Sequence, residues 1–148
     1  MRHILLLLIL LISRPGLGCD PDSIQSMNPA SDEQLEELVT CLASPDPGLR
    51  DEFAYTHLAE LLRDQRPADE QLEFLSARLD QLLQQPDPVG VAHPFAVLVL
   101  AEIARTDRIE AWMSDTQRQE MVDTAGNYLE SVLHPERRPD SARPCVVQ

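Results

Sequence analysis

The chain contains no lysine. All twelve of its basic residues are arginines, set against 25 aspartates and glutamates, and the formal net charge is −13. The missing lysine excludes a Schiff-base lysine and the lysine of a phosphate-binding loop, because both need a primary amine that arginine cannot replace. The excess of acids repels phosphate backbones, so we expect no nucleic acid partner.

Short catalytic motifs are also missing. The sequence has no G-x-S-x-G or H-E-x-x-H motif, no glycine-rich phosphate loop and no EF-hand loop. We therefore predict no catalytic residue, no cofactor-binding residue and no cofactor. His57, Glu60 and Asp64 are spaced to share a helix face that could hold a metal ion. A solvated charged face is the commoner meaning of this pattern, so we predict no metal ligand.

The longest apolar run lies at the N-terminus. Arg2 precedes nine consecutive leucines and isoleucines, residues 4–12, and small residues follow as far as Gly18. This is the layout of a secretory signal peptide. Nine residues at about 1.5 Å each cannot span a bilayer core of about 30 Å. We predict that residues 1–18 are a signal peptide and that the protein is exported to a bacterial periplasm or cell envelope.

Two cleavage routes stay open at this signal. Gly16 and Gly18 supply the small residues that ordinary signal peptidase needs, which is the route we favour. Gly18-Cys19 resembles the end of a lipobox, which would place a lipid anchor on Cys19 and attach the protein to a membrane. That lipobox is imperfect, because Gly16 and Leu17 stand where a leucine and a small residue are usual. An uncleaved leader is the third alternative.

The cysteines are odd in number: Cys19, Cys41 and Cys145. One must stay unpaired or be modified. Cys41 falls in an apolar helical pattern, so we favour an unpaired core residue and keep a disulfide with Cys19 as the alternative.

An internal repeat organises the rest of the chain. Three short patterns occur twice in the same order: DEQLE at 32–36 and 69–73, PDP at 45–47 and 86–88, and FA-x-x-x-LAE at 53–60 and 95–102. Their offsets are 37, 41 and 42 residues. Self-similarity of this period marks stacked helical hairpins.

Helical periodicity and two capping boxes place the elements. Ser31 with Gln34 and Ser114 with Gln117 are capping-box signatures. The apolar pattern predicts helices over residues 31–43, 47–64, about 72–83, 94–105 and 114–133. Residues 94–101 are apolar nearly all round, as expected of a helix covered on several sides. The partner helix of the third hairpin should begin near Pro139, yet that segment is rich in proline and arginine.

These observations predict an all-α fold, a right-handed stack of antiparallel helical hairpins forming an α-α solenoid of about two and a half repeats. The stretch LVTCLASPDPGLRDEFAYTHLAEL, residues 38–61, resembles a HEAT repeat, and this resemblance implies a HEAT-like solenoid. Residues 19–30 would be a linker, 31–133 the helical domain and 134–148 an irregular tail.

The polar stretch SPDPGLRDEF, residues 44–53, predicts a helix start rather than an active site. Asp46 is placed to cap the helix, and Pro47 fits the first turn because it has no N–H to leave unpaired. Arg50 follows Asp46 by four residues, the favourable order for an ion pair. We interpret all three as structural turn and cap residues.

Residues 34–133 resemble the bacterial family known as domain of unknown function 2785, through PDPGLRDEFAYTHLAELL, HPFAVLVLAEIARTDRIEAW and NYLESV. The resemblance implies an all-helical HEAT-like fold and no activity. Members of that family continue with an acidic-Arg-Gly segment and a helix of the type G-W-x-H-x-x-A-H. This chain reads LHPERRPDSARPCVVQ after Val132, so no residue of that motif carries over.

The sequence thus predicts an exported, non-enzymatic helical protein that binds another protein through its solenoid surface. The third hairpin, lacking its second helix, offers a place for another copy of the chain. The alternative function is a remnant of an exported hydrolase or metal-dependent enzyme whose site lies in further C-terminal helices.

Overall fold

The computed structural model describes residue 19 and residues 30–135, and all regular structure in this part of the chain is helical. The predicted all-α class is therefore confirmed. In chain order the elements are α1 (Asp32–Cys41), η2 (Gly48–Tyr55), α2 (Thr56–Glu60), η3 (Leu61–Gln65), α3 (Asp69–Gln84), α4 (Ala92–Ile109) and α5 (Asp115–Leu133). The predicted signal peptide, most of the linker and tail, and the predicted helix start at Pro139 lie outside the described residues.

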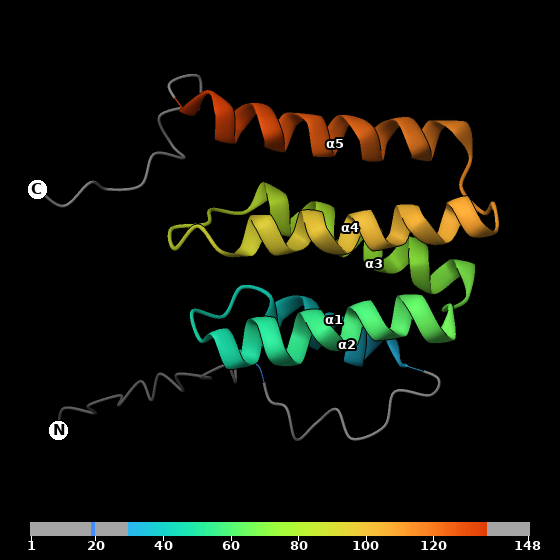
Figure 1. Ribbon diagram of the computed structural model, residues 1–148, viewed down its shortest axis with the longest axis horizontal. Coiled ribbons are helices and arrows are strands. Elements are labelled where there is room, and N and C mark those ends of the chain that lie inside the picture. The colour runs from blue at the N-terminus through green and yellow to red at the C-terminus, as the bar shows by residue number, and fades with distance from the viewer. Residues whose placement is uncertain (1–18, 20–29, 136–148) are drawn as a thin grey trace, which may run out of the picture.

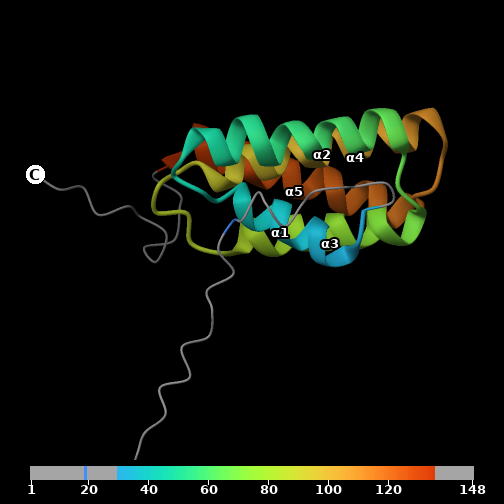
Figure 2. The same ribbon diagram turned by 90° about the horizontal axis from the view of Figure 1, so that it is seen from below.

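The helices lie in three layers with their axes roughly parallel (Figure 1). Helix α1 and the long helix formed by η2, α2 and η3 make the first layer, α3 and α4 the second, and α5 the third. Seen from below, α1 and α3 lie along one side and α2 and α4 along the other, with α5 between the two rows (Figure 2). Helix α3 packs against α1 and α4, and α4 also contacts α5.

Both predicted capping boxes are confirmed. Ser31 Oγ accepts a hydrogen bond from the Gln34 N–H at 3.3 Å, and Gln34 Oε1 accepts one from the Ser31 N–H at 2.9 Å. Ser114 and Gln117 make the same reciprocal pair at 3.2 and 2.8 Å. Each box satisfies two N–H groups that have no partner inside the helix, and so defines where α1 and α5 begin.

The second helix occupies almost the predicted range, but its turns are not uniform. The segments η2 and η3 have the wide π-helical turn, and only five residues between them form regular α-helix. The helix ends at Arg66, whose φ of 43° is in the left-handed region and cannot continue a right-handed helix.

Helix α4 is longer than predicted at both ends. At its start the Asp87 carboxylate accepts hydrogen bonds from the N–H groups of Gly90, Val91 and His93, so the helix begins two residues before Pro94. At its end Asp107 lies inside the last turn. An acid is unfavourable there on dipole grounds alone, but Asp107 accepts hydrogen bonds from the N–H groups of Trp112 and Met113.

The core consists mainly of leucines from the first two layers. The fully buried ones are Leu35, Leu38, Leu42, Leu58, Leu62, Leu72, Leu75 and Leu79. Helix α4 adds Ala96, Val99, Leu100 and Ile103, whereas α5 contributes no buried residue. The apolar segment 94–101 is covered on part of its circumference: Ala96, Val99 and Leu100 are buried, whereas Leu98 is 46% exposed.

Within the described residues, no helix combines the length and apolar character needed to cross a membrane.

Candidate functional site

The turn at residues 44–50 contains the first set of singled-out residues. Asp46 Oδ1 accepts a hydrogen bond from the Gly48 N–H at 2.9 Å, and Pro47 stands directly before η2. The predicted pair of Asp46 with Arg50 is wrong: the Arg50 guanidinium pairs with Asp51, its Nε lying 2.5 Å from Oδ1. The Asp46 carboxylate is instead directed to the backbone of the turn through its hydrogen bond from Gly48, and Arg50 pairs with the neighbouring acid.

Arg50 also links two layers of the molecule. Its guanidinium carbon lies 5.1 Å from the centre of the Phe95 ring on α4, within the range of a cation–π contact. Nη1 donates to the Ser44 carbonyl at 3.3 Å. Asp51, Phe95 and the Ser44 carbonyl thus hold the Arg50 side chain within the fold.

The face with His57 has no metal-binding geometry. His57 Nδ1 lies 2.7 Å from the Phe53 carbonyl oxygen, and its ring packs on the Phe53 ring at 4.7 Å. Glu60 and Asp64 are exposed to solvent. In the part of the chain that the structure describes, no three histidine, cysteine or acidic side chains are grouped to hold a metal ion.

Cys41 is completely buried, and its sulfur is bonded to Cys19 in a disulfide with a Cα–Cα distance of 4.9 Å. The preference for an unpaired Cys41 is thus corrected in favour of the alternative. The periodicity of α1 reports only that Cys41 faces the core. It carries no information on where residue 19, 22 positions earlier, lies in space. Cys145 lies outside the described residues.

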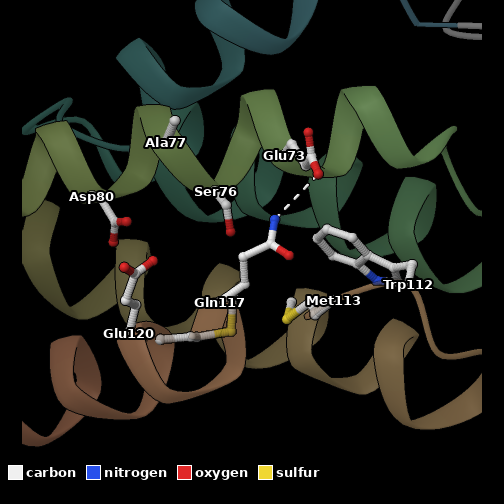
Figure 3. A pocket seen from close by; sticks show the side chains of 9 residues that line it. Glu73, Ser76, Ala77, Asp80, Trp112, Met113, Gln117 and Glu120 are labelled. Carbon is white, nitrogen blue, oxygen red and sulfur yellow. Dashed lines mark hydrogen bonds between the residues drawn. The ribbon is translucent and has the colours of Figure 1, made fainter. Parts of the chain in front are cut away.

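A crevice lies between α3 and α5 (Figure 3). Its volume is about 220 Å³. It is lined by Glu73, Ser76, Ala77 and Asp80 of α3, by Trp112 and Met113 of the α4–α5 turn, and by Gln117, Glu120 and Met121 of α5. Within the described part of the chain, no arginine lines it.

Asp107 holds the end wall of this crevice in place. Its Oδ1 accepts hydrogen bonds from the N–H groups of Trp112 and Met113 at 2.9 and 2.8 Å, and its Oδ2 accepts one from Arg118 Nε at 2.7 Å. The Arg118 hydrogen bond is the main cause that lowers the pKa of Asp107 to about 2, against the opposing effect of burial. The indole Nε1–H of Trp112 donates to Thr106 Oγ1 at 3.1 Å, which fixes the ring orientation.

The acids of the crevice face each other. Figure 3 shows the carboxylates of Asp80 and Glu120 turned toward one another from the two helices. Burial raises the pKa of Asp80, and the negative charge of Glu120 raises it further. Glu73 is the exception, because it accepts a hydrogen bond from Gln117 Nε2 at 3.2 Å.

A positively charged group between Asp80 and Glu120 would offset the repulsion between the two carboxylates. Trp112 lies at the other end of the crevice, with Gln117 between (Figure 3). The sequence prediction missed this pair of acids because each lies at an ordinary exposed helix position. No local signal marks the pair, because Asp80 and Glu120 are 40 residues apart and belong to different helices.

Comparison with known proteins returns no match: no family model, no curated protein and no solved structure matches the chain. The resemblance to domain of unknown function 2785 therefore stays a prediction. The function must be argued from the molecule itself.

Proposed function

We propose that this chain is an exported helical interaction module with HEAT-like repeats, which binds another protein along α5 and performs no chemistry on it. The repeat stacking is supported by hydrogen bonds that polar side chains make to residues about one repeat away. These pairs are Gln71 with Ala30, Arg78 with Glu36, Arg63 with Glu102 and Gln117 with Glu73, at separations of 41, 42, 39 and 44 residues. In stacked repeats a residue lies beside its equivalent in the next repeat.

The exposed apolar stripe of α5 is the observation that carries the binding function. Val122, Leu129, Val132 and Leu133 are between 51% and 72% exposed. Their spacing places them on one side of the helix. An exposed apolar patch on an otherwise polar surface marks a protein interaction site.

The expected partner element is an amphipathic helix. In stacked hairpins each helix packs against the next one, and the stripe of α5 is an unpartnered face of that kind. Leu98, on the neighbouring helix α4, is also exposed. A helix that carries apolar residues at i, i+3, i+4 and i+7 would bury such a stripe. Because the chain is strongly acidic, with a net charge of −13, basic residues beside that apolar face would favour association.

The test is crosslinking of the full chain in cells that export it. We compare wild type with the double variant Val122→Ser/Leu129→Ser and with the control Asp123→Asn/Glu130→Gln, which changes exposed charges on the same helix. We expect one partner to be captured by wild type and control, and at least tenfold less of it by the stripe variant. Equal capture by all three proteins, or no partner above background, would contradict the proposal.

Light scattering on the purified proteins separates one further outcome. If wild type and control are dimers and the stripe variant is a monomer, the stripe binds a second copy of this chain rather than a different protein.

A further inference from the structure

A glycine lies inside the exposed apolar stripe of α5. Gly126 follows Val122 by four residues and precedes Leu129 by three, so the three residues share one side of the helix. Val122 and Leu129 are 64% and 55% exposed, and the backbone of Gly126 between them is exposed as well. Helix α5 forms the third layer (Figure 1), and its outer side therefore presents an apolar stripe with a gap.

The fold itself does not require glycine at this position. The other two glycines in the described part of the chain have an internal reason: Gly90 has a φ of 76°, and a Cβ atom on Gly48 would lie 3.3 Å from Asp46 Oδ1. Gly126 belongs to a regular α-helix, and a Cβ atom there would have no atom of the neighbouring elements within 4 Å. Glycine is unfavourable inside a helix compared with alanine. Helix α5 thus contains a destabilising residue that its own packing does not explain.

A glycine on a helix surface lets a second helix approach closely. Without a Cβ atom, the backbone itself becomes the contact surface, and the distance between two packed helices depends on the side chains at their contact. Val122 and Leu129 would enclose such a contact from both sides along the helix. The gap therefore fits one apolar side chain of a partner helix.

The charges of α5 decide between two kinds of partner. From residue 119 to the end of the helix, every charged residue is an acid: Glu120, Asp123 and Glu130. A second copy of this chain would bring the same acids to this helix, whereas a helix with basic residues beside its apolar face would be attracted to it. Each exposed ion pair contributes little affinity, so the acids select the partner and the apolar contact holds it.

We propose that Gly126 is the specificity-determining residue of the stripe, and that a basic amphipathic helix docks there with one bulky apolar side chain over Gly126, between Val122 and Leu129. That the stripe binds a protein at all rests on the proposed function. The role of Gly126 is a separate claim, because a stripe without a gap would also bind an apolar helix.

Fluorescence anisotropy of labelled helical peptides, titrated with the full-length protein, provides the test. The first peptide has leucines at i, i+3, i+4 and i+7 with lysines on both sides of them. The second has alanine in place of the leucine at i+4, and the third has glutamates in place of the lysines. We expect saturable binding of the first peptide to wild type and at least tenfold weaker binding of the other two.

The variant Gly126→Ala should affect folding and binding in opposite directions. In urea unfolding it should raise the ratio of folded to unfolded molecules about fivefold, because alanine favours the helix and meets no neighbouring atom. It should weaken the first peptide at least tenfold and remove the preference for leucine over alanine at i+4, because the new Cβ atom occupies the gap. The control Asn127→Ala changes the next exposed residue, which lies off the stripe, and should leave affinity within twofold.

Four results would overturn the inference: no saturable binding of the first peptide, equal binding of the glutamate peptide, an unchanged preference for leucine in Gly126→Ala, or equal weakening by Asn127→Ala. A wild-type dimer in light scattering that Gly126→Ala converts to a monomer would also overturn it, since a second copy would then occupy the gap.

Crosslinking in cells, with Gly126→Ala added to the proteins compared, separates this inference from the proposed function. If the stripe variant loses its partner while Gly126→Ala captures as much as wild type, only the role of Gly126 falls. If the peptides behave as expected while no partner is captured, the role of Gly126 stands and the interaction function falls.

Discussion

The interface of α3 with α1 and its interface with α5 differ in burial and in charge. Below they are called the first and the second interface. Toward α1, helix α3 packs fully buried leucines and closes the contact with the pair of Arg78 and Glu36. Toward α5 it meets a helix without a single buried residue, across a cavity lined by acids. Two helices that pack on the same helix can thus make contacts of very different kinds. The first interface is closed by buried leucines and an ion pair, whereas the second contains an open crevice.

Helix α5 is held mainly at its start. Arg118 in its second turn pairs with the buried Asp107 of α4, and Ser114 caps its first turn. Farther along, the apolar residues from Val122 onward point mostly to solvent. Because α5 is attached mainly at its start, one side of the helix borders the acidic crevice while the apolar stripe on another side stays exposed.

The largest expected difference between the two interfaces is in core truncation. Leu79→Ala removes a completely buried side chain of α3 and should lower the free energy of unfolding by about 3 kcal/mol, through lost burial and the cavity left behind. Leu129→Ala on α5, where the side chain is 55% exposed, should change it by less than about 0.5 kcal/mol. Urea unfolding followed by circular dichroism measures both. Equal losses would show that α5 is as tightly packed as the first interface.

The attachment of α5 should depend on pH through Asp107. Its folded pKa of about 2 lies below the ordinary 3.8, so its stabilising effect is fully present above about pH 4 and disappears as pH falls toward 2. At pH 7, Asp107→Asn should cost about 2 kcal/mol, because each unit of pKa shift corresponds to about 1.4 kcal/mol. Hydrogen exchange of the α5 amides, together with urea unfolding at several pH values, tests this.

Asp115 provides the matched control for that experiment. It pairs with the same Arg118 at 2.8 Å but is fully exposed. Asp115→Asn should therefore have almost no effect at any pH. If it destabilised α5 as much as Asp107→Asn does, the charge of Arg118 rather than the buried carboxylate would explain the attachment.

The smallest expected effect comes from making the second interface resemble the first. Glu120→Arg places a cation opposite Asp80 and should raise the free energy of unfolding by about 0.5 kcal/mol, the usual size for a partly exposed ion pair. Glu130→Arg makes the same charge change outside the crevice and should raise the free energy of unfolding by less. An equal gain from the two variants would show that the overall charge, rather than the contact with Asp80, is responsible.

Much of the fold could be predicted because its signals are local. The capping boxes at Ser31 and Ser114 and the spacing of the leucines depend on residues within one or two turns of each other. Helix ends were less accurate where an acid accepts hydrogen bonds from backbone N–H groups near them, as Asp87 and Asp107 do for α4. An acid in a sequence does not reveal whether backbone N–H groups surround it.

The candidate site could not be predicted in the same way. Asp80 and Glu120 each occupy positions that look like solvated helix surface, and only the stacking of layers brings them together. The preference for an unpaired Cys41 was wrong for the same reason, because the disulfide joins α1 to Cys19, which lies outside every described helix. In both cases the deciding information is a distance between segments far apart in the chain.

The Cys19–Cys41 disulfide has a chemical consequence beyond its role in the fold. A lipid thioether on Cys19 and the bond to Cys41 both require the same Sγ atom, so oxidation and acylation exclude each other in any one molecule. A copy with this disulfide carries no lipid on that sulfur, and a copy with the predicted lipid thioether would leave a free thiol at Cys41, enclosed in the core. Whichever reaction reached Cys19 first, oxidation or lipid transfer, would therefore decide between a tether to the protein's own core and a tether to a bilayer.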